Sequence, residues 1–167
     1  RERKIEKRDY AIILIAARLG LRVSDILNIR FKDIDWEQHQ LHIIQPKTKH
    51  LNILPLSKEV GWAIIDYIQH ARPVCKNEYL FVKMRHPFEK MEKFHNFNKY
   101  FETEEIENTK KGIHNLRHSL AKNMLDNDIP LHTISSVLGH QSLETTSNTY
   151  LSIDAKHLKG CSLEVEE

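Results

Sequence analysis

The sequence predicts an α+β fold that is mainly helical and contains one small antiparallel sheet. Three observations support this fold class. An apolar run, DYAIILIAARL at 9–19, is long enough to form a buried helix. The stretch 41–56, LHIIQPKTKHLNILPL, contains alternating and β-branched residues around a polar turn. Beyond Gly112, short segments carry helix start and stop signals such as Pro130 and Gly139.

Size and composition limit the class of protein. A chain of 167 residues fits one domain, and 40% hydrophobic with 29% charged residues is typical of a globular protein. No apolar run approaches the ~18–20 residues that cross a bilayer. Two cysteines without a CxxC spacing disfavour a disulfide framework, so we expect a cytoplasmic protein. The net charge of +2 argues neither for nor against a nucleic-acid partner.

The first elements are helical. Residues 1–8, RERKIEKR, are strongly basic and suit either a solvated helix end or an arm that contacts phosphates. The buried helix 9–19 follows, Gly20 interrupts it, and helical character resumes over 22–30.

The middle of the chain predicts the sheet and another helix. Strands are expected at 41–44 and 51–56, joined by a turn. Ser57 is a helix cap, and apolar positions recur every three or four residues until Pro73. A weaker helix is expected over 94–101.

Three short helices are predicted after Gly112. The first carries HNLRHSLAKNML, the second runs from Pro130 to Gly139, and the third begins near Ser142 and carries Tyr150. The last residues, SLEVEE, suit a strand or a tail.

His114 and Arg117 are the first candidate site residues. Three positions apart on a helix, they project from the same side, and an imidazole beside a guanidinium can hold paired oxygens of a phosphate. The spacing also suits an ordinary helix with an incidental histidine. Two further interpretations compete here: a helix-turn-helix DNA reader over 126–140, and a metal pair of His114 with His118, although no third ligand is suggested.

The chain resembles the tyrosine recombinase, or phage integrase, family. That family carries an Arg in a G-L-R-x-S-[DE] segment, a Lys in a β-hairpin, H-x-x-R, L-G-H and a following Tyr. This sequence has GLRVSD at 20–25, PKTK at 46–49, HNLRH at 114–118, LGH at 138–140 and NTY at 148–150, in the family's order. Each motif alone is weak, and the ordered set is specific.

The resemblance implies a catalytic set for cleaving and rejoining DNA. Tyr150 would be the nucleophile that forms a 3′-phosphotyrosine, with no metal, no ATP and no other cofactor. Arg22 and Arg117 would neutralise the non-bridging oxygens, and His114 and His140 would assist. Lys47 would be the general acid, with Lys49 as the alternative. The supporting residues would be Asp25 and His118, and DNA would be contacted by Lys49, Arg22 and Arg117.

The resemblance also implies domain organisation and partners. Residues 1–167 would be one catalytic domain, a fragment that lacks an N-terminal DNA-binding domain. The partner would be a double-stranded recombination site, on which protomers would assemble as a tetramer, with no membrane. A type IB topoisomerase and a non-catalytic DNA-binding module on the same fold are the alternatives.

Overall fold

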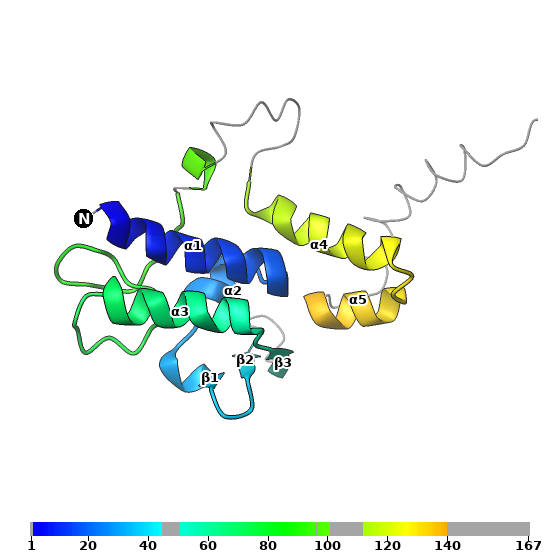
Figure 1. Ribbon diagram of the computed structural model, residues 1–167, viewed down its shortest axis with the longest axis horizontal. Helices are drawn as coiled ribbons and strands as arrows, with labels where there is room; N and C mark the ends of the chain where they lie inside the picture. The colour runs from blue at the N-terminus through cyan, green and yellow to red at the C-terminus, as the bar shows by residue number, and fades with distance from the viewer. Residues whose placement is uncertain (1, 45–50, 96, 101–111, 140–167) are drawn as a thin grey trace, which may run out of the picture.

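The computed structural model of the chain describes residues 2–44, 51–95, 97–100 and 112–139. Its architecture is mainly helical with one three-stranded antiparallel sheet, as predicted (Figure 1). The elements follow in the order α1 (Glu2–Leu19), α2 (Val23–Leu27), β1 (Ile34–Asp35), β2 (Gln40–Ile44), β3 (Leu51–Pro55), α3 (Lys58–His70), α4 (His114–Asp126) and α5 (Leu131–Leu138).

Helix α1 joins two predicted segments in one continuous helix. The basic residues at its start and the apolar run 9–19 form 18 residues of helix that end before Gly20. Gly20 has a φ of +62°, which L side chains rarely adopt, so the chain turns there and α2 starts two residues after Leu21. The predicted interruption is confirmed.

The sheet forms where the β-branched stretch predicts it, and it has an additional strand. Strands β2 and β3 pair in antiparallel register, with Leu41 opposite Leu54 and Ile44 opposite Leu51. The two-residue strand β1 adds to the free edge of β2, where Ile34 faces Leu41. Because β1 is too short to show an alternating pattern, the sequence did not single it out.

Helices α1 and α3 pack side by side over the main hydrophobic core (Figure 1). The Ser57 hydroxyl accepts a hydrogen bond from the Val60 amide, so the predicted cap of α3 is confirmed. The buried face of α3 includes Ile64 and Tyr67, and the Tyr67 ring stacks on Phe81 with the centroids 5.4 Å apart. The inner faces of β2 and β3 complete this core.

Helices α4 and α5 pack together around a second, small cluster, and α4 also packs against α1 (Figure 1). Ala121, Ile134 and Leu138 are buried between them. Pro130 precedes α5, and Gly139 ends it in the left-handed conformation with φ 63° and ψ 45°, as the sequence predicts. The predicted third helix and the SLEVEE tail lie outside the described residues.

The helix expected over 94–101 is wrong for the residues described there. Only a 3₁₀ turn forms, at Asn98–Tyr100. Aromatic, Asn and His residues have low helix propensity, and tertiary contacts decide the segment instead. Phe97 is buried, and the Tyr100 hydroxyl donates to the Asp9 carboxylate at 3.0 Å.

Candidate active site

Arg22 lies at the turn between α1 and α2. It is the residue before the first turn of α2, in extended backbone conformation. Its side chain is 41% exposed, and its guanidinium lies 4.0 Å from the Asp25 carboxylate, one helical turn further on. The turn therefore places the Arg22 cation at the surface, next to the buried Asp25 carboxylate.

Asp25 is a buried carboxylate beneath this arginine. Burial raises the pKa of Asp25 above its usual value, against the opposing effects of Arg22, the Ser24 hydroxyl and Arg117. Arg22 and Arg117 are 95 positions apart in sequence (117 − 22), yet both act electrostatically on this one carboxyl. The fold therefore brings together the two arginines and the aspartate that the sequence selected.

Arg117 is buried on α4 and joins three segments of the chain. Its Nη1 donates to the Gly20 carbonyl at 2.5 Å, and its Nη2 donates to the Leu138 carbonyl at 2.7 Å. Two of the five N–H donors of the guanidinium thus bind the α1–α2 turn and the end of α5. Because a planar guanidinium has a fixed fork of donors, these two bonds set the orientation of the whole group.

Gly20 permits this close approach. A Cβ at this position would lie 2.6 Å from Leu138 Cδ2 and 2.9 Å from Leu120 Cδ2, closer than real Cβ contacts. The positive φ and the lack of a side chain allow the turn to pack directly on the α4–α5 pair. The positive φ and the close packing thus explain why the GLRVSD segment has a glycine at position 20.

The histidines of α4 lie at its exposed start. His114 is the first residue of the helix, one turn before Arg117, and His118 is exposed one turn after His114. Within the described residues, no three His, Cys, Asp or Glu side chains gather in a way that could hold a metal ion. The pairing of His114 and His118 at a metal stays without a third ligand in this part of the chain.

The other predicted site residues fall on segments outside the described residues. Lys47 and Lys49 belong to 45–50, which connects the paired residues Ile44 and Leu51. His140 follows Gly139 in sequence, and Tyr150 lies further on. No described helix is long and apolar enough to cross a membrane.

A cavity of about 400 Å³ lies beside Asp25, and the sequence did not single it out. Its lining includes Asn28, Arg30, Lys32, His42 and Tyr79. The Tyr79 ring attracts two cations, with Arg30 Cζ 5.0 Å and Lys90 Nζ 4.7 Å from its centroid. Tyr79 and Lys90 come from the stretch between α3 and α4, which has no regular periodicity from which their meeting could be predicted.

Comparison with known proteins decides the family. The family model described as "Phage integrase family" matches residues 1–157. The chain belongs to the phage integrase family. This confirms the resemblance drawn from the ordered motifs.

Curated proteins named as integrases or recombinases are similar over nearly the whole chain. The putative integrase/recombinase y4gC of Sinorhizobium fredii (strain NBRC 101917 / NGR234) is 32% identical over 160 residues, which cover 95% of this chain and 83% of that protein. The tyrosine recombinase XerA of Pyrococcus furiosus is 34% identical over 91% of this chain and 52% of its own length. The chain also spans 40% of a second Sinorhizobium relative, y4rA.

Similar solved structures of recombinases confirm the predicted fold class. The XerH site-specific recombinase, in a post-cleavage complex with palindromic difH substrate, matches with a TM-score of 0.79 and 22% identity. That match covers 98% of this chain and 47% of XerH. The XerA recombinase matches with a TM-score of 0.70 and 23% identity, over 93% of this chain and 62% of XerA.

Proposed function

We propose that the chain is the catalytic domain of a site-specific DNA recombinase that cleaves and rejoins strands through a 3′-phosphotyrosine. The observation that carries this proposal is the convergence of Arg22 and Arg117 on the buried Asp25. Family membership and the DNA complex of the similar XerH protein support duplex DNA as the substrate.

The two arginines suit a phosphodiester for an electrostatic reason. Charge develops on the non-bridging oxygens when an oxygen nucleophile attacks phosphorus, and preorganised donors stabilise that charge. Arg117 is already oriented by the Gly20 and Leu138 carbonyls, so its guanidinium needs little rearrangement when the phosphate arrives. Each such donor typically contributes ~3–4 kcal/mol to the transition state.

In the proposed step the Tyr150 oxygen bonds to phosphorus and the bond from phosphorus to the 5′-oxygen breaks. The tyrosine proton passes to His114, and the leaving 5′-oxygen takes a proton from Lys47. His140 donates a hydrogen bond to the phosphate, and Asp25 with His118 supports the arginines and the α4 start. A phenol of pKa ~10 costs about 4 kcal/mol to ionise at pH 7, so the base and the cations are both needed.

Rejoining of the strands in the reverse step needs no separate energy source. The covalent link keeps the energy of the phosphodiester, and a 5′-hydroxyl from another strand attacks it to release Tyr150. Recombination in this form requires protomers to meet on two duplexes, and we propose a tetramer on DNA.

Covalent adduct formation tests the proposed function. The chain is incubated with a nicked duplex that carries its recombination-site core, and products are separated on denaturing gels. The wild type is expected to give a protein–DNA band that Tyr150→Phe abolishes and that EDTA leaves unchanged. An adduct that survives in Tyr150→Phe contradicts the nucleophile, and loss in EDTA contradicts metal-free cleavage. Relaxation of supercoils without strand exchange would favour the topoisomerase alternative.

A substrate with a 5′-bridging sulfur separates the two hairpin lysines. Sulfur leaves without a proton, so the variant that lacks the general acid regains cleavage on this substrate. We expect rescue of Lys47→Ala and little change for Lys49→Ala. Rescue of Lys49→Ala alone would move the role to Lys49.

A further inference from the structure

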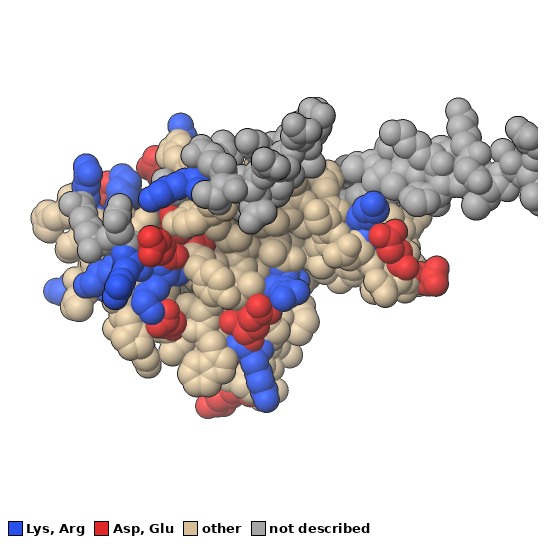
Figure 2. Space-filling view, turned by 45° about the horizontal axis from the view of Figure 1, so that its top comes forward, with Lys and Arg blue, Asp and Glu red and all other residues tan. Residues whose placement is uncertain are grey.

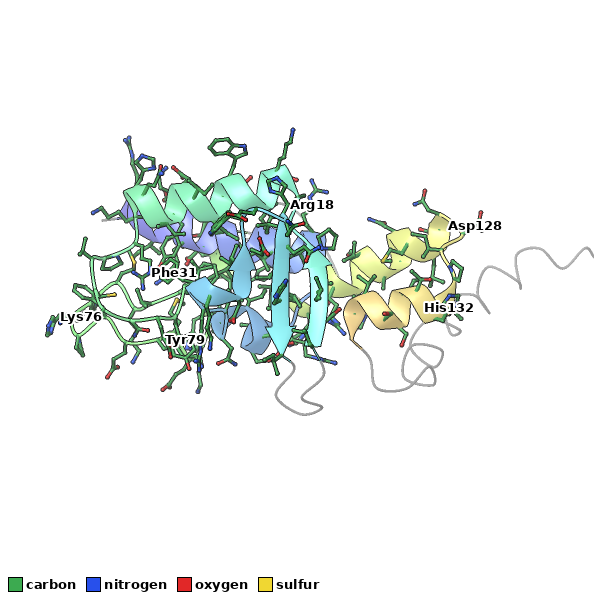
Figure 3. The ribbon with its side chains drawn as sticks, turned by 90° about the horizontal axis from the view of Figure 1, so that it is seen from below. Arg18, Phe31, Lys76, Tyr79, Asp128 and His132 are labelled. Carbon is green, nitrogen blue, oxygen red and sulfur yellow. The ribbon has the colours of Figure 1, made fainter. Side chains whose placement is uncertain are left out.

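The cavity beside Asp25 carries cations that the proposed cleavage does not use. It lies between the end of α2, strand β2 and Tyr79. In Figure 3, Tyr79 lies along the same lower edge as α2 and the end of β2, with α3 along the opposite edge. Because Asp25 belongs to both the cavity lining and the arginine cluster, the cavity adjoins the candidate active site.

Lys90 lies next to the cavity, where it is held by two neutral side chains of the cavity lining. Its ammonium donates to the Asn28 side-chain carbonyl and lies over the Tyr79 ring. The Asn28 amide nitrogen donates to the Ser24 carbonyl at 2.7 Å, which fixes the amide oxygen as the acceptor for Lys90. Among the described residues no carboxylate contacts Lys90. The positive charge of this ammonium is therefore not offset by a described carboxylate.

Arg30 places a second cation beside the same ring. Its Nη2 donates to the Tyr79 hydroxyl at 3.2 Å, and its Nη1 pairs with Glu78 at the same distance. Two cations within about 5 Å of one ring repel each other, and an anion that contacts both would remove the repulsion.

Lys32 adds a third cation at the cavity. It is exposed and makes no hydrogen bond or ion pair with any described residue. The nearby carboxylates already have partners, since Asp25 pairs with Arg22, Asp33 accepts from the Arg30 amide and Glu78 pairs with Arg30. The surplus positive charge therefore lies on Lys32 and Lys90.

At the basic end of the molecule, unlike at the cavity, several cations have carboxylate partners. Figure 2 shows Lys and Arg gathered at the end where α1 begins, with acidic residues among them. Cations from the first half of α1 and from the segment beside it are paired with carboxylates: Lys7 with Asp66, Arg8 with Asp9 and Lys83 with Glu89. Ion pairs therefore offset part of the positive charge at that end.

We propose that Lys32 and Lys90, with Arg30, bind a backbone phosphate of the duplex outside the cleavage point. The inference rests on the proposed function, because it places a second DNA contact beside the catalytic one. A phosphate in this cavity fixes the register of the duplex over Arg22 and Arg117 without reading its sequence.

Salt dependence of duplex binding tests this inference, because each phosphate contact adds about 0.9 to the slope of log affinity against log salt. A nonspecific duplex serves as the probe. Between 50 and 200 mM salt, each lost contact reduces the fall in affinity about 3.5-fold. We expect that reduction for Lys32→Gln and for Lys90→Gln. The matched control is Lys58→Gln, an exposed lysine on α3 for which we expect an unchanged slope.

The outcomes separate this inference from the proposed function. Lys90→Gln removes the hydrogen bond to Asn28 and so also affects stability, whereas Lys32 makes no hydrogen bond or ion pair with a described residue and decides the case. Equal slopes for wild type and Lys32→Gln overturn the inference, as does an equal reduction in Lys58→Gln. Altered slopes in a chain that forms no covalent adduct would support the phosphate site and contradict the recombinase step. An adduct with unchanged slopes would do the reverse.

Discussion

The two hydrophobic clusters of the described residues differ in size and in how their position is fixed. The larger one is built from α1, α2, α3, the sheet and residues around Phe81, and it includes many fully buried side chains. The smaller one has Ala121, Ile134 and Leu138 as its buried members. A core this small supplies little stabilisation of its own. Within the part of the chain that the structure describes, the α4–α5 pair therefore depends on its contacts with the larger body.

Those contacts include apolar packing, since Leu116 of α4 lies against the larger cluster, and hydrogen bonds at the candidate site. Arg117 of the α4–α5 pair donates to the Gly20 carbonyl of the larger body, and the Asn52 side chain donates to the Val137 carbonyl at 3.3 Å. Arg22 belongs to the larger body and Arg117 to the pair. The candidate active site therefore lies at the junction of the two regions, and its geometry depends on how firmly they are joined.

The largest expected effect compares one substitution in both clusters. Ile64 and Ile134 are each fully buried, and Ile→Ala in a core typically costs 2–5 kcal/mol. Ile64→Ala is expected to lower the free energy of unfolding of the whole chain by about that amount. Ile134→Ala is expected to cost less globally and to open the α4–α5 pair locally. Urea unfolding with hydrogen exchange measures both.

Exchange protection decides whether the regions are separate. In Ile134→Ala we expect faster amide exchange over 114–139 and unchanged exchange in α1. Faster exchange spread equally over α1 and α3 would show that the chain opens as one unit. That result would contradict separate opening of the α4–α5 pair.

A smaller effect is expected at the junction itself. Gly20→Ala places a Cβ at positive φ, which costs about 1–2 kcal/mol, and it presses on Leu138 and Leu120. We expect lower stability and slower covalent adduct formation, because the Gly20 carbonyl orients Arg117.

Gly61→Ala is the matched control for this substitution. Gly61 is within α3, and a Cβ there would make ordinary contacts of 3.9 Å with Leu56 and Trp36. Alanine in a helix is more favourable than glycine by roughly 0.5–1 kcal/mol. Stability should rise slightly and adduct formation should not change. Equal loss of cleavage in both variants would contradict the role of Gly20.

The smallest effect is a pH dependence within the larger body. The hydrogen bond from Lys7 to Asp66, with further help from His70, lowers the pKa of Asp66 below its ordinary 3.8. A lowered carboxyl pKa stabilises the fold above the unfolded value, and the contribution is lost as pH falls through the folded value. The difference in Tm between wild type and Asp66→Asn should therefore disappear in strong acid. The side chains of Lys7 and Asp66 are 38% and 43% exposed, so we expect the difference in Tm to be small.

Local signals predicted most of the fold. The α3 cap at Ser57, the α5 boundaries at Pro130 and Gly139, and the hairpin strands all depend on nearest neighbours in the chain, which the sequence displays directly. Strand β1 and the 3₁₀ turn Asn98–Tyr100 depend on pairing and packing with distant residues, and no local pattern reveals them.

The candidate site, too, was predictable from the sequence only in part. Motif order selected Arg22, Asp25 and Arg117, and the structure brings these three together. Two partners of Arg117 are backbone carbonyls 97 and 21 positions away, and a backbone carbonyl carries no residue-type signal. The meeting of Arg30 and Lys90 at Tyr79 is equally invisible in sequence, because it depends on an irregular segment.

The most direct test of the central claim is the single-turnover rate of covalent adduct formation by Arg22→Lys and Arg117→Lys. If both guanidiniums stabilise the phosphate in the transition state, each variant should cleave about 10²–10³-fold more slowly while still binding duplex DNA. Arg117→Lys should also lower Tm, since a lysine cannot hold the Gly20 and Leu138 carbonyls as a fork does. Cleavage at the wild-type rate by either variant would contradict the account.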